Sequence, residues 1–203
     1  MEPAKRKATY QDVLDAPEDV VAEIIGGELR LSPRPGGPHT RATSRLGQVI
    51  GGPFDLGSGG PGGWIILDEP ELHLRDDIVV PDLAGWRRAR MPAVADEAFF
   101  TLPPDWVCEA LSRSTAVHDR SEKLPIYAAA GIGHVWLVDA IQRTLEVLRL
   151  HEGRWLIVAV HRHDARVRAE PFDALEIELS TLWPDRAPLP PRASEPGADY
   201  ALE

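Results

Sequence analysis

The stretch from Asp105 to Asp139 constrains the fold of this chain more than any other, because it predicts a strand, a helix and a second strand in succession. The side chains of residues 105–111 are predicted to point alternately to the two faces of a strand that is packed on both sides. Residues 134–139 (HVWLVD) are almost all apolar and form the predicted return strand. A strand, helix, strand order with an apolar return strand indicates one sheet that the helix covers.

The helix between these strands is predicted to begin at Asp119, because Asp119 and Glu122 have the spacing of a capping box, with Asp in place of Ser or Thr. It runs to about Ala130 and ends at Gly131. Lys123 lies in its first turns, where a cation gains nothing from the helix dipole. Lys123 is therefore a candidate partner for a carboxylate outside the helix.

Glu109 is the unusual residue of the first strand, since it shares a face with apolar Val107 and Leu111. An unpaired carboxylate on a buried face is costly, so Glu109 needs a cation, a hydrogen-bond donor or a proton. Cys108 points to the opposite face and is expected to lie in the core.

The length of 203 residues fits one domain with a sizeable core. We expect this domain to span residues 1–183 and the proline-rich residues 184–203 to form a flexible tail. No segment is long and apolar enough to span a membrane, and no signal peptide is recognised. The single cysteine fits a reducing cytoplasm. The net charge of −10 argues against a surface that coats nucleic acid broadly, although it leaves room for a local basic cleft.

The rest of the chain predicts mainly strands and hairpins. Gly26-Gly27 and Glu152-Gly153 are turn signals, and each joins two β-rich runs. The Gly-rich residues 51–63 lack the Gly-Lys-Ser/Thr ending of a phosphate-binding loop and are interpreted as a mobile loop. The predicted elements are a helix at 10–16, strands at 20–25 and 28–32, a helix at 39–50, strands at 64–67, 71–74 and 78–82, a connector at 86–104, strands at 144–150 and 155–161, and short strands within 166–178.

Three side chains could carry chemistry: Asp82 after Pro81, Glu109 and Lys123. Two carboxylates at neighbouring strand ends can hold a hard cation such as Mg²⁺ through oxygen, and the carbonyl of Ala110 could add a ligand. A lysine beside them can orient a metal-bound water and help to deprotonate it, as attack on a phosphodiester requires. The alternatives are that Asp82 only caps a turn and that Lys123 is a solvated helix lysine or pairs with a nearby helix carboxylate.

Several segments of the chain between Glu23 and Asp139 resemble the Uma-two family of endonucleases, which belongs to the PD-(D/E)XK, restriction-endonuclease-like superfamily. The resemblance implies an α/β fold with a mixed β-sheet flanked by helices and additional β-hairpins. It also implies that Asp82 and Glu109 bind Mg²⁺, or Mn²⁺ in its place, and that the chain forms a homodimer. The superfamily's usual lysine position is Leu111 here, so the resemblance assigns that role to Lys123. The matching segments are Glu23–Leu29, Ser32-Pro33, His39, Pro81-Asp82, Glu109–Ser112, Ser114-Thr115, Asp119, Glu122–Leu124, Tyr127, Gly131 and Val135–Asp139.

Five further side chains are candidates for contacts with phosphate. His39 and Arg41 follow a proline-rich turn at a predicted helix start, where backbone N–H groups favour anions. Arg113, His118 and Arg120 flank the central motif and could line a basic cleft. The alternative for all five is ordinary surface charge.

Glu23 could reach the metal site from the first hairpin, although an ion pair with an arginine is the favoured alternative.

The leading functional hypothesis is a cytoplasmic, Mg²⁺-dependent endonuclease that hydrolyses DNA. The alternative is a catalytically inactive nuclease-fold module that binds nucleic acid or protein. A third interpretation takes the second hairpin and the return strands as a dimer surface.

Overall fold

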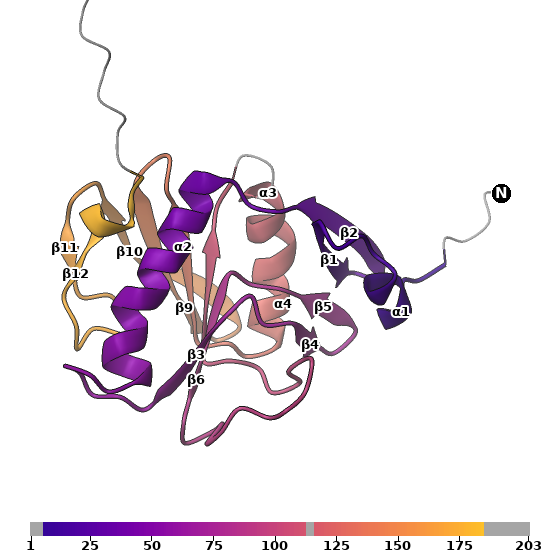
Figure 1. The fold of residues 1–203 in the computed structure, drawn as a ribbon, viewed down its shortest axis with the longest axis horizontal. Coiled ribbons are helices and arrows are strands. Elements are labelled where there is room, and N and C mark those ends of the chain that lie inside the picture. Colours follow the sequence, from indigo (N-terminus) through magenta and orange to yellow (C-terminus); the bar gives the residue numbers. More distant parts are fainter. Residues whose placement is uncertain (1–5, 113–115, 185–203) are drawn as a thin grey trace, which may run out of the picture.

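The computed structural model describes residues 6–112 and 116–184, which form two main β-sheets and the helices packed around them (Figure 1). Residues 185–203 of the predicted tail lie outside the described residues. In chain order the elements are α1 (Tyr10–Leu14), β1 (Val20–Ile25), β2 (Glu28–Pro33), α2 (Gly37–Ile50), the π-helical turn η1 (Gly51–Asp55), β3 (Trp64–Asp68), β4 (Leu72–Leu74), β5 (Asp77–Val79), β6 (Leu83–Arg87), β7 (Trp106–Ala110), α3 (Ala116–His118), the π-helical turn η2 (Asp119–Lys123), α4 (Leu124–Ala129), β8 (His134–Asp139), β9 (Thr144–His151), β10 (Arg154–Arg162), β11 (Arg166–Val167), β12 (Ile177–Glu178) and the 3₁₀ turn η3 (Leu179–Leu182).

The larger sheet has six strands in the order β10-β9-β8-β7-β6-β3. Its central strands β7 and β8 are parallel, and Glu109 lies opposite Leu137 in their register. The other neighbouring pairs are antiparallel, so the sheet is mixed. The predicted strand, helix, strand unit is confirmed, because the helical segment from α3 to α4 connects the two parallel strands.

Helices cover both faces of this sheet (Figure 1). On one face, Leu46 and Ile50 of α2 belong to a core that includes Trp106 and Cys108 of β7. On the other face, Tyr127 of α4 belongs to a second core that includes Val107 and Leu111. The predicted alternation of β7 is therefore confirmed, and Glu109, on the face of Val107 and Leu111, is directed toward the helical segment.

The smaller sheet has four strands in the order β2-β1-β5-β4. Its hairpin β1–β2 turns at Gly26 and Gly27, whose φ angles are +61° and +79°. Two consecutive positive φ angles are characteristic of type I′ turns, which glycines adopt at little cost. This sheet carries Glu23 of β1 to the side of the larger sheet where the helical segment lies.

Strand β6 was not predicted, because the sequence analysis ended a strand at Asp82 and treated residues from Trp86 onward as a connector. Residues 83–86 are buried, and β6 pairs with β3 on one side and β7 on the other. Asp82 therefore precedes a central strand. Tertiary pairing decides this arrangement, since a five-residue strand containing a glycine has a weak local signal.

The predicted helix start at Asp119 is also wrong. The chain is already helical from Ala116, and Asp119 is the first residue of η2, with its side chain buried. Asp119 therefore does not cap a helix. Its carboxylate faces the pocket described below, where a lysine offsets the cost of burying it.

The loop predicted to begin at Gly51 begins later, because α2 continues directly into η1. The side chain of Phe54 in this turn is 2% exposed and packs in the core beneath α2. Burial of an aromatic side chain holds this glycine-rich segment in place.

Within the described residues, no helix combines the length and the apolar character that crossing a membrane requires.

Candidate active site

Asp82 reaches its position because β6 and β7 are antiparallel neighbours, with Leu83 opposite Cys108. This register places the residue before β6 beside the end of β7. Asp82 Oδ2 accepts a hydrogen bond of 2.7 Å from the backbone N–H of Ala110. Asp82 Oδ1 lies 3.2 Å from Nε2 of His39, which is close to the N-terminus of α2. Both oxygens are thus held at the end of β7, beside Glu109.

Glu109 is 3% exposed, and its carboxylate points from β7 toward the helical segment. The hydroxyl of Tyr127 donates a hydrogen bond to Glu109 Oε1. Lys123 Nζ lies 3.3 Å from Oε1 and 3.5 Å from Oε2. Burial raises the pKa of Glu109 well above its usual value, and the charges of Asp119 and Asp82 raise it further, whereas Lys123 and Tyr127 act in the opposite direction.

Lys123 lies at the centre of the site, and its side chain is 8% exposed. Its Nζ is 2.9 Å from Glu23 Oε1 and 3.8 Å from Asp119 Oδ1. Burial alone would lower the pKa of Lys123, but the carboxylates of Glu109, Glu23 and Asp119 together raise it above its usual value. Because the amine stays protonated, Lys123 acts as a fixed positive charge. The predicted role of Lys123 toward a metal-bound water stays a prediction.

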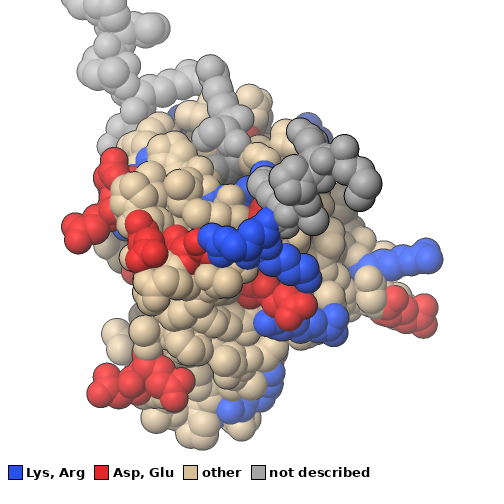
Figure 2. Space-filling view, turned by 90° about the vertical axis from the view of Figure 1, so that its right-hand side faces the viewer, with Lys and Arg blue, Asp and Glu red and all other residues tan. Residues whose placement is uncertain are grey.

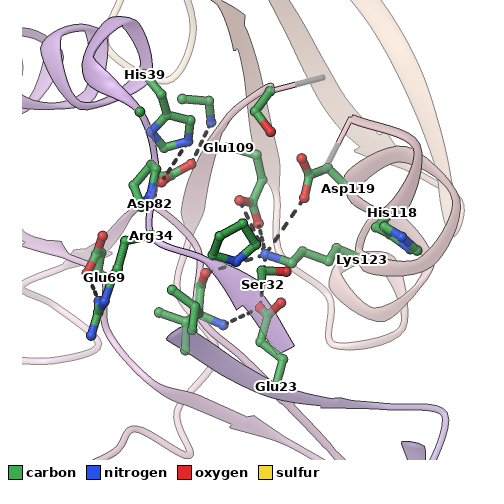
Figure 3. A pocket seen from close by; sticks show the side chains of 17 residues that line it. Glu23, Ser32, Arg34, His39, Glu69, Asp82, Glu109, His118, Asp119 and Lys123 are labelled. Atoms are coloured by element: carbon green, nitrogen blue, oxygen red, sulfur yellow. Dashed lines mark hydrogen bonds and ion pairs between the residues drawn. The ribbon is translucent and has the colours of Figure 1, made fainter. Parts of the chain in front are cut away.

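Figure 3 shows these side chains converging on one pocket. It is bounded by β1, by the segment from Ser32 to Gly36 before α2, by the ends of β5 and β7, and by the helical segment that carries Asp119 and Lys123. Asp82, Glu109, Ala110 and Lys123 all line it. Asp82 and Lys123, which are 41 positions apart in sequence, thus line one acidic pocket.

Glu23 and Asp119 complete the pocket. The sequence analysis gave a place at this site as one possibility for Glu23 and assigned Asp119 no role there. Glu23 pairs with Lys123, so the favoured alternative of an arginine partner is wrong. Asp119 was interpreted as a cap. The spacing of Asp119, Lys123 and Tyr127 at every fourth position could have revealed that all three share one helix face.

Only some of the side chains predicted to contact phosphate lie at the pocket. His39 and His118 line it, and His39 contacts Asp82. Arg41 does not line the pocket. Arg120 does not line it either, and its guanidinium forms an ion pair of 2.5 Å with Glu146. Arg41 was predicted from its place near a helix start and Arg120 from its proximity to the central motif, and neither position determines the direction of a side chain. Arg113 lies outside the described residues.

The donor set of the pocket suits a hard divalent cation. Asp82, Glu109 and the Ala110 carbonyl offer only oxygen, and Mg²⁺ often uses one or two carboxylates and keeps several waters. The crowding of Asp119 and Asp82 around Glu109, which raises its pKa, is the negative field that a cation would relieve. Among the described residues, no group of three or more His, Cys, Asp or Glu side chains is arranged as a ready metal cage. A cation here would therefore depend on few protein ligands.

Comparison with known proteins identifies the family and the fold of this chain. The model of the Uma2 family, described as "Putative restriction endonuclease", matches residues 8–181. A crystal structure from Anabaena variabilis, described as "a putative nuclease belonging to DUF820", superposes with a TM-score of 0.68 at 24% identity over 87% of this chain and 97% of that chain. The predicted restriction-endonuclease-like α/β fold is thereby confirmed. No curated protein matched the chain.

Proposed function

The chain belongs to the Uma2 family, and we propose that it is a Mg²⁺-dependent endonuclease that hydrolyses phosphodiester bonds in DNA. The observation that carries the proposal is the convergence of Asp82, Glu109 and Lys123 in one pocket, with Lys123 Nζ 3.3 Å from Glu109. Acidic side chains with a strongly shifted pKa in a concave site are typical of catalytic centres.

Asp82, Glu109 and the carbonyl of Ala110 would hold the cation. When bound, Mg²⁺ or Mn²⁺ would polarise the phosphate and increase the acidity of a water molecule. The hydrogen bond from the Ala110 N–H fixes the Asp82 carboxylate at the end of β7. Tyr127 fixes the Glu109 carboxylate from the helix side. Both acids are thus oriented before any ligand arrives, which lowers the cost of organising the site.

Lys123 supplies positive charge beside these acids. A buried ammonium can stabilise the negative charge that develops on phosphate oxygens during hydrolysis. The sequence contains only three lysines among its 22 Lys and Arg residues, and the other two are Lys5 and Lys7. A compact ammonium at position 123, in a chain that otherwise uses arginine, supports a specific role for that group.

A DNA substrate is a polyanion, and it has to reach a pocket in a protein that is itself negatively charged. Figure 2 shows the face that carries the β1–β2 hairpin, on which acidic and basic side chains lie beside each other. We expect weak DNA binding, because only a few phosphates would be contacted by Lys or Arg, and we expect added salt to weaken it further, since each such contact releases counterions. Measuring binding to a duplex by fluorescence anisotropy between low and moderate salt tests this expectation.

Cleavage of supercoiled plasmid in Mg²⁺ tests the catalytic proposal. Asp82→Asn and Glu109→Gln keep the size of each side chain and remove its charge, so both should reduce cleavage at least about 100-fold, as loss of essential catalytic groups does. Glu97→Gln, an exposed acidic position, is the matched control and should keep wild-type activity. Equal cleavage by all four proteins would refute the assignment of these acids.

A catalytically inactive binding module is the second candidate, and two observations favour it. The chain carries a net charge of −10, and Lys123 and Tyr127 both contact the Glu109 carboxylate. Calorimetric titration with Mg²⁺ separates the two functions. Heat of binding that disappears in Glu109→Gln supports the enzyme, and no binding to the wild type supports the module.

A homodimer is part of the proposal. Strand β10 is an edge strand of the larger sheet, and its exposed Leu156, Ile157, Val158 and Val160 form an apolar run. Exposed apolar edge strands pair readily with another chain. Light scattering at several concentrations tests this proposal, and a monomer at all of them would reject it. A cytoplasmic location remains a prediction, and the free, buried Cys108 supports it.

A further inference from the structure

Glu23 closes the pocket from the smaller sheet, and its side chain is 6% exposed. Its Oε1 lies 2.9 Å from Lys123 Nζ, which is the shortest of the contacts between that amine and the surrounding carboxylates. The same oxygen accepts a hydrogen bond of 2.8 Å from the backbone N–H of Val80. One oxygen of Glu23 therefore joins the lysine to the segment between β5 and β6.

Val80 also completes this arrangement through its carbonyl. Lys123 Nζ lies 3.4 Å from Val80 O, so the amine, the Glu23 carboxylate and both backbone groups of Val80 form a closed ring of polar contacts. Val80 stands two residues before Asp82, with Pro81 between them. Because proline restricts the backbone here, the position of Val80 is coupled to that of Asp82.

The lysine needs such an anchor, because its four-carbon stem is flexible and two other carboxylates attract it. Glu109 and Asp119 lie on the same side of the amine as the pocket interior, at 3.3 Å and 3.8 Å (Figure 3). Without an opposing anchor, the ammonium would no longer be held at one distance from Glu109. In its closer positions it would compete with a cation for the Glu109 carboxylate, and in its farther positions it would be open to reagents in solvent.

We propose that Glu23 is a positioning residue of the active site, which holds the Lys123 ammonium at a fixed distance from Glu109 and so makes the β1–β2 hairpin part of the catalytic unit. This inference rests on the proposed function. Glu23 does not touch the reacting atoms and acts only through Lys123 and Val80. Its role is to fix the geometry of the amine, and small displacements of such groups are costly in catalysis.

The substitution Glu23→Gln tests the proposal, because the amide oxygen can still accept from Val80 while the negative charge is lost. The control is Glu28→Gln, which changes an acid on the same hairpin whose charge pairs with Arg30 and which does not line the pocket. Two measurements are made on each protein. The first is the rate of reductive methylation of Lys123, normalised to exposed Lys7 in the same sample and followed by mass spectrometry. The second is the kinetics of plasmid cleavage in Mg²⁺.

In Glu23→Gln, we expect methylation of Lys123 to accelerate at least about fivefold, because an amine that loses its shortest buried ion pair is freer to leave the pocket. We expect kcat for cleavage to fall about 10- to 100-fold with KM within about twofold, as misplacement of a group near the reacting centre predicts. A general structural defect would instead change KM and the circular dichroism spectrum together. Glu28→Gln should match the wild type in both measurements.

The results separate this inference from the proposed function. Unchanged methylation and unchanged kcat in Glu23→Gln would overturn the positioning role while leaving the nuclease proposal intact. Faster methylation in Glu23→Gln than in the wild type, together with a wild type that does not cleave DNA, would reject the nuclease proposal and support the anchoring of Lys123. If Glu23→Gln fails to fold, Glu23→Asp replaces it, since the shorter carboxylate keeps the charge and loses reach. Unchanged methylation in Glu23→Asp would then overturn the inference.

Discussion

Lys123→Met removes the positive charge from the pocket while keeping a side chain of similar length. Three carboxylates would then remain around the vacated position, since the amine lies 2.9 Å from Glu23, 3.3 Å from Glu109 and 3.8 Å from Asp119. Removal of one partner from a buried ion pair costs about 3–5 kcal/mol, because the remaining charge is uncompensated. We expect the free energy of unfolding to fall by about this amount near pH 7.5, out of a typical total of about 5–15 kcal/mol.

The loss should depend on pH in a defined direction. The pKa of Glu109 is already raised above its usual 4.5 by burial and neighbouring acids, and loss of Lys123 raises it further. A carboxylic acid with a raised folded-state pKa contributes stability that is present below its unfolded pKa and is lost as the pH rises through its folded pKa. The difference between Lys123→Met and the wild type should therefore be small at pH 4.5 or below and should grow as the pH rises.

Urea denaturation followed by circular dichroism at several pH values measures these differences. Lys7→Met, which removes an exposed lysine, should change stability by less than about 0.5 kcal/mol. In the double variant Lys123→Met/Glu109→Gln, part of the lost stability should return, since the amide is neutral and still accepts the Tyr127 hydrogen bond, while Glu23 and Asp119 still lack the ammonium. A loss below about 1 kcal/mol near pH 7.5, or one that does not vary with pH, would refute the view that Lys123 neutralises this pocket.

Three further substitutions or measurements test the surroundings. Tyr127→Phe deletes the hydroxyl that donates to Glu109 and should lower the free energy of unfolding by about 1–3 kcal/mol in urea denaturation. Gly85→Ala should destabilise by a similar ~1–3 kcal/mol in thermal unfolding, because the added Cβ would lie 3.2 and 3.3 Å from two buried tryptophan rings. The pKa of His39 should exceed its usual 6.5 in an NMR titration, since Asp82 outweighs the effect of burial, and Asp82→Asn should lower it. A His39 pKa at or below 6.5 in the wild type would contradict this pairing.

Much of the fold could be predicted from local patterns. Alternation in residues 105–111 and the apolar run at 134–139 correctly predicted the central parallel strands. The turn signals Gly26-Gly27 and Glu152-Gly153 correctly located both hairpins, because positive φ angles favour glycine. Strand β6 could not be predicted, since its burial depends on two neighbouring strands and its own five residues give little signal.

The sequence predicted that carboxylates and a lysine form the site, but it identified only some of the residues that line it. Glu109 stood out because a carboxylate on a buried face requires a partner. Glu23 and Asp119 could not be assigned with the same assurance, since an acid on a hairpin or near a helix has several ordinary roles. The direction of a side chain and the identity of its partner depend on how distant segments pack.

By itself, the sequence determined most of the strands and helices and that Glu109 must be neutralised, because periodicity and the cost of buried charge act locally or on single residues. Only the tertiary structure decided that Asp82 precedes a central strand, that Asp119 faces inward and that Glu23 holds Lys123 from a second sheet. These features depend on pairing and packing between segments far apart along the chain, and no local pattern encodes the distance between two side chains.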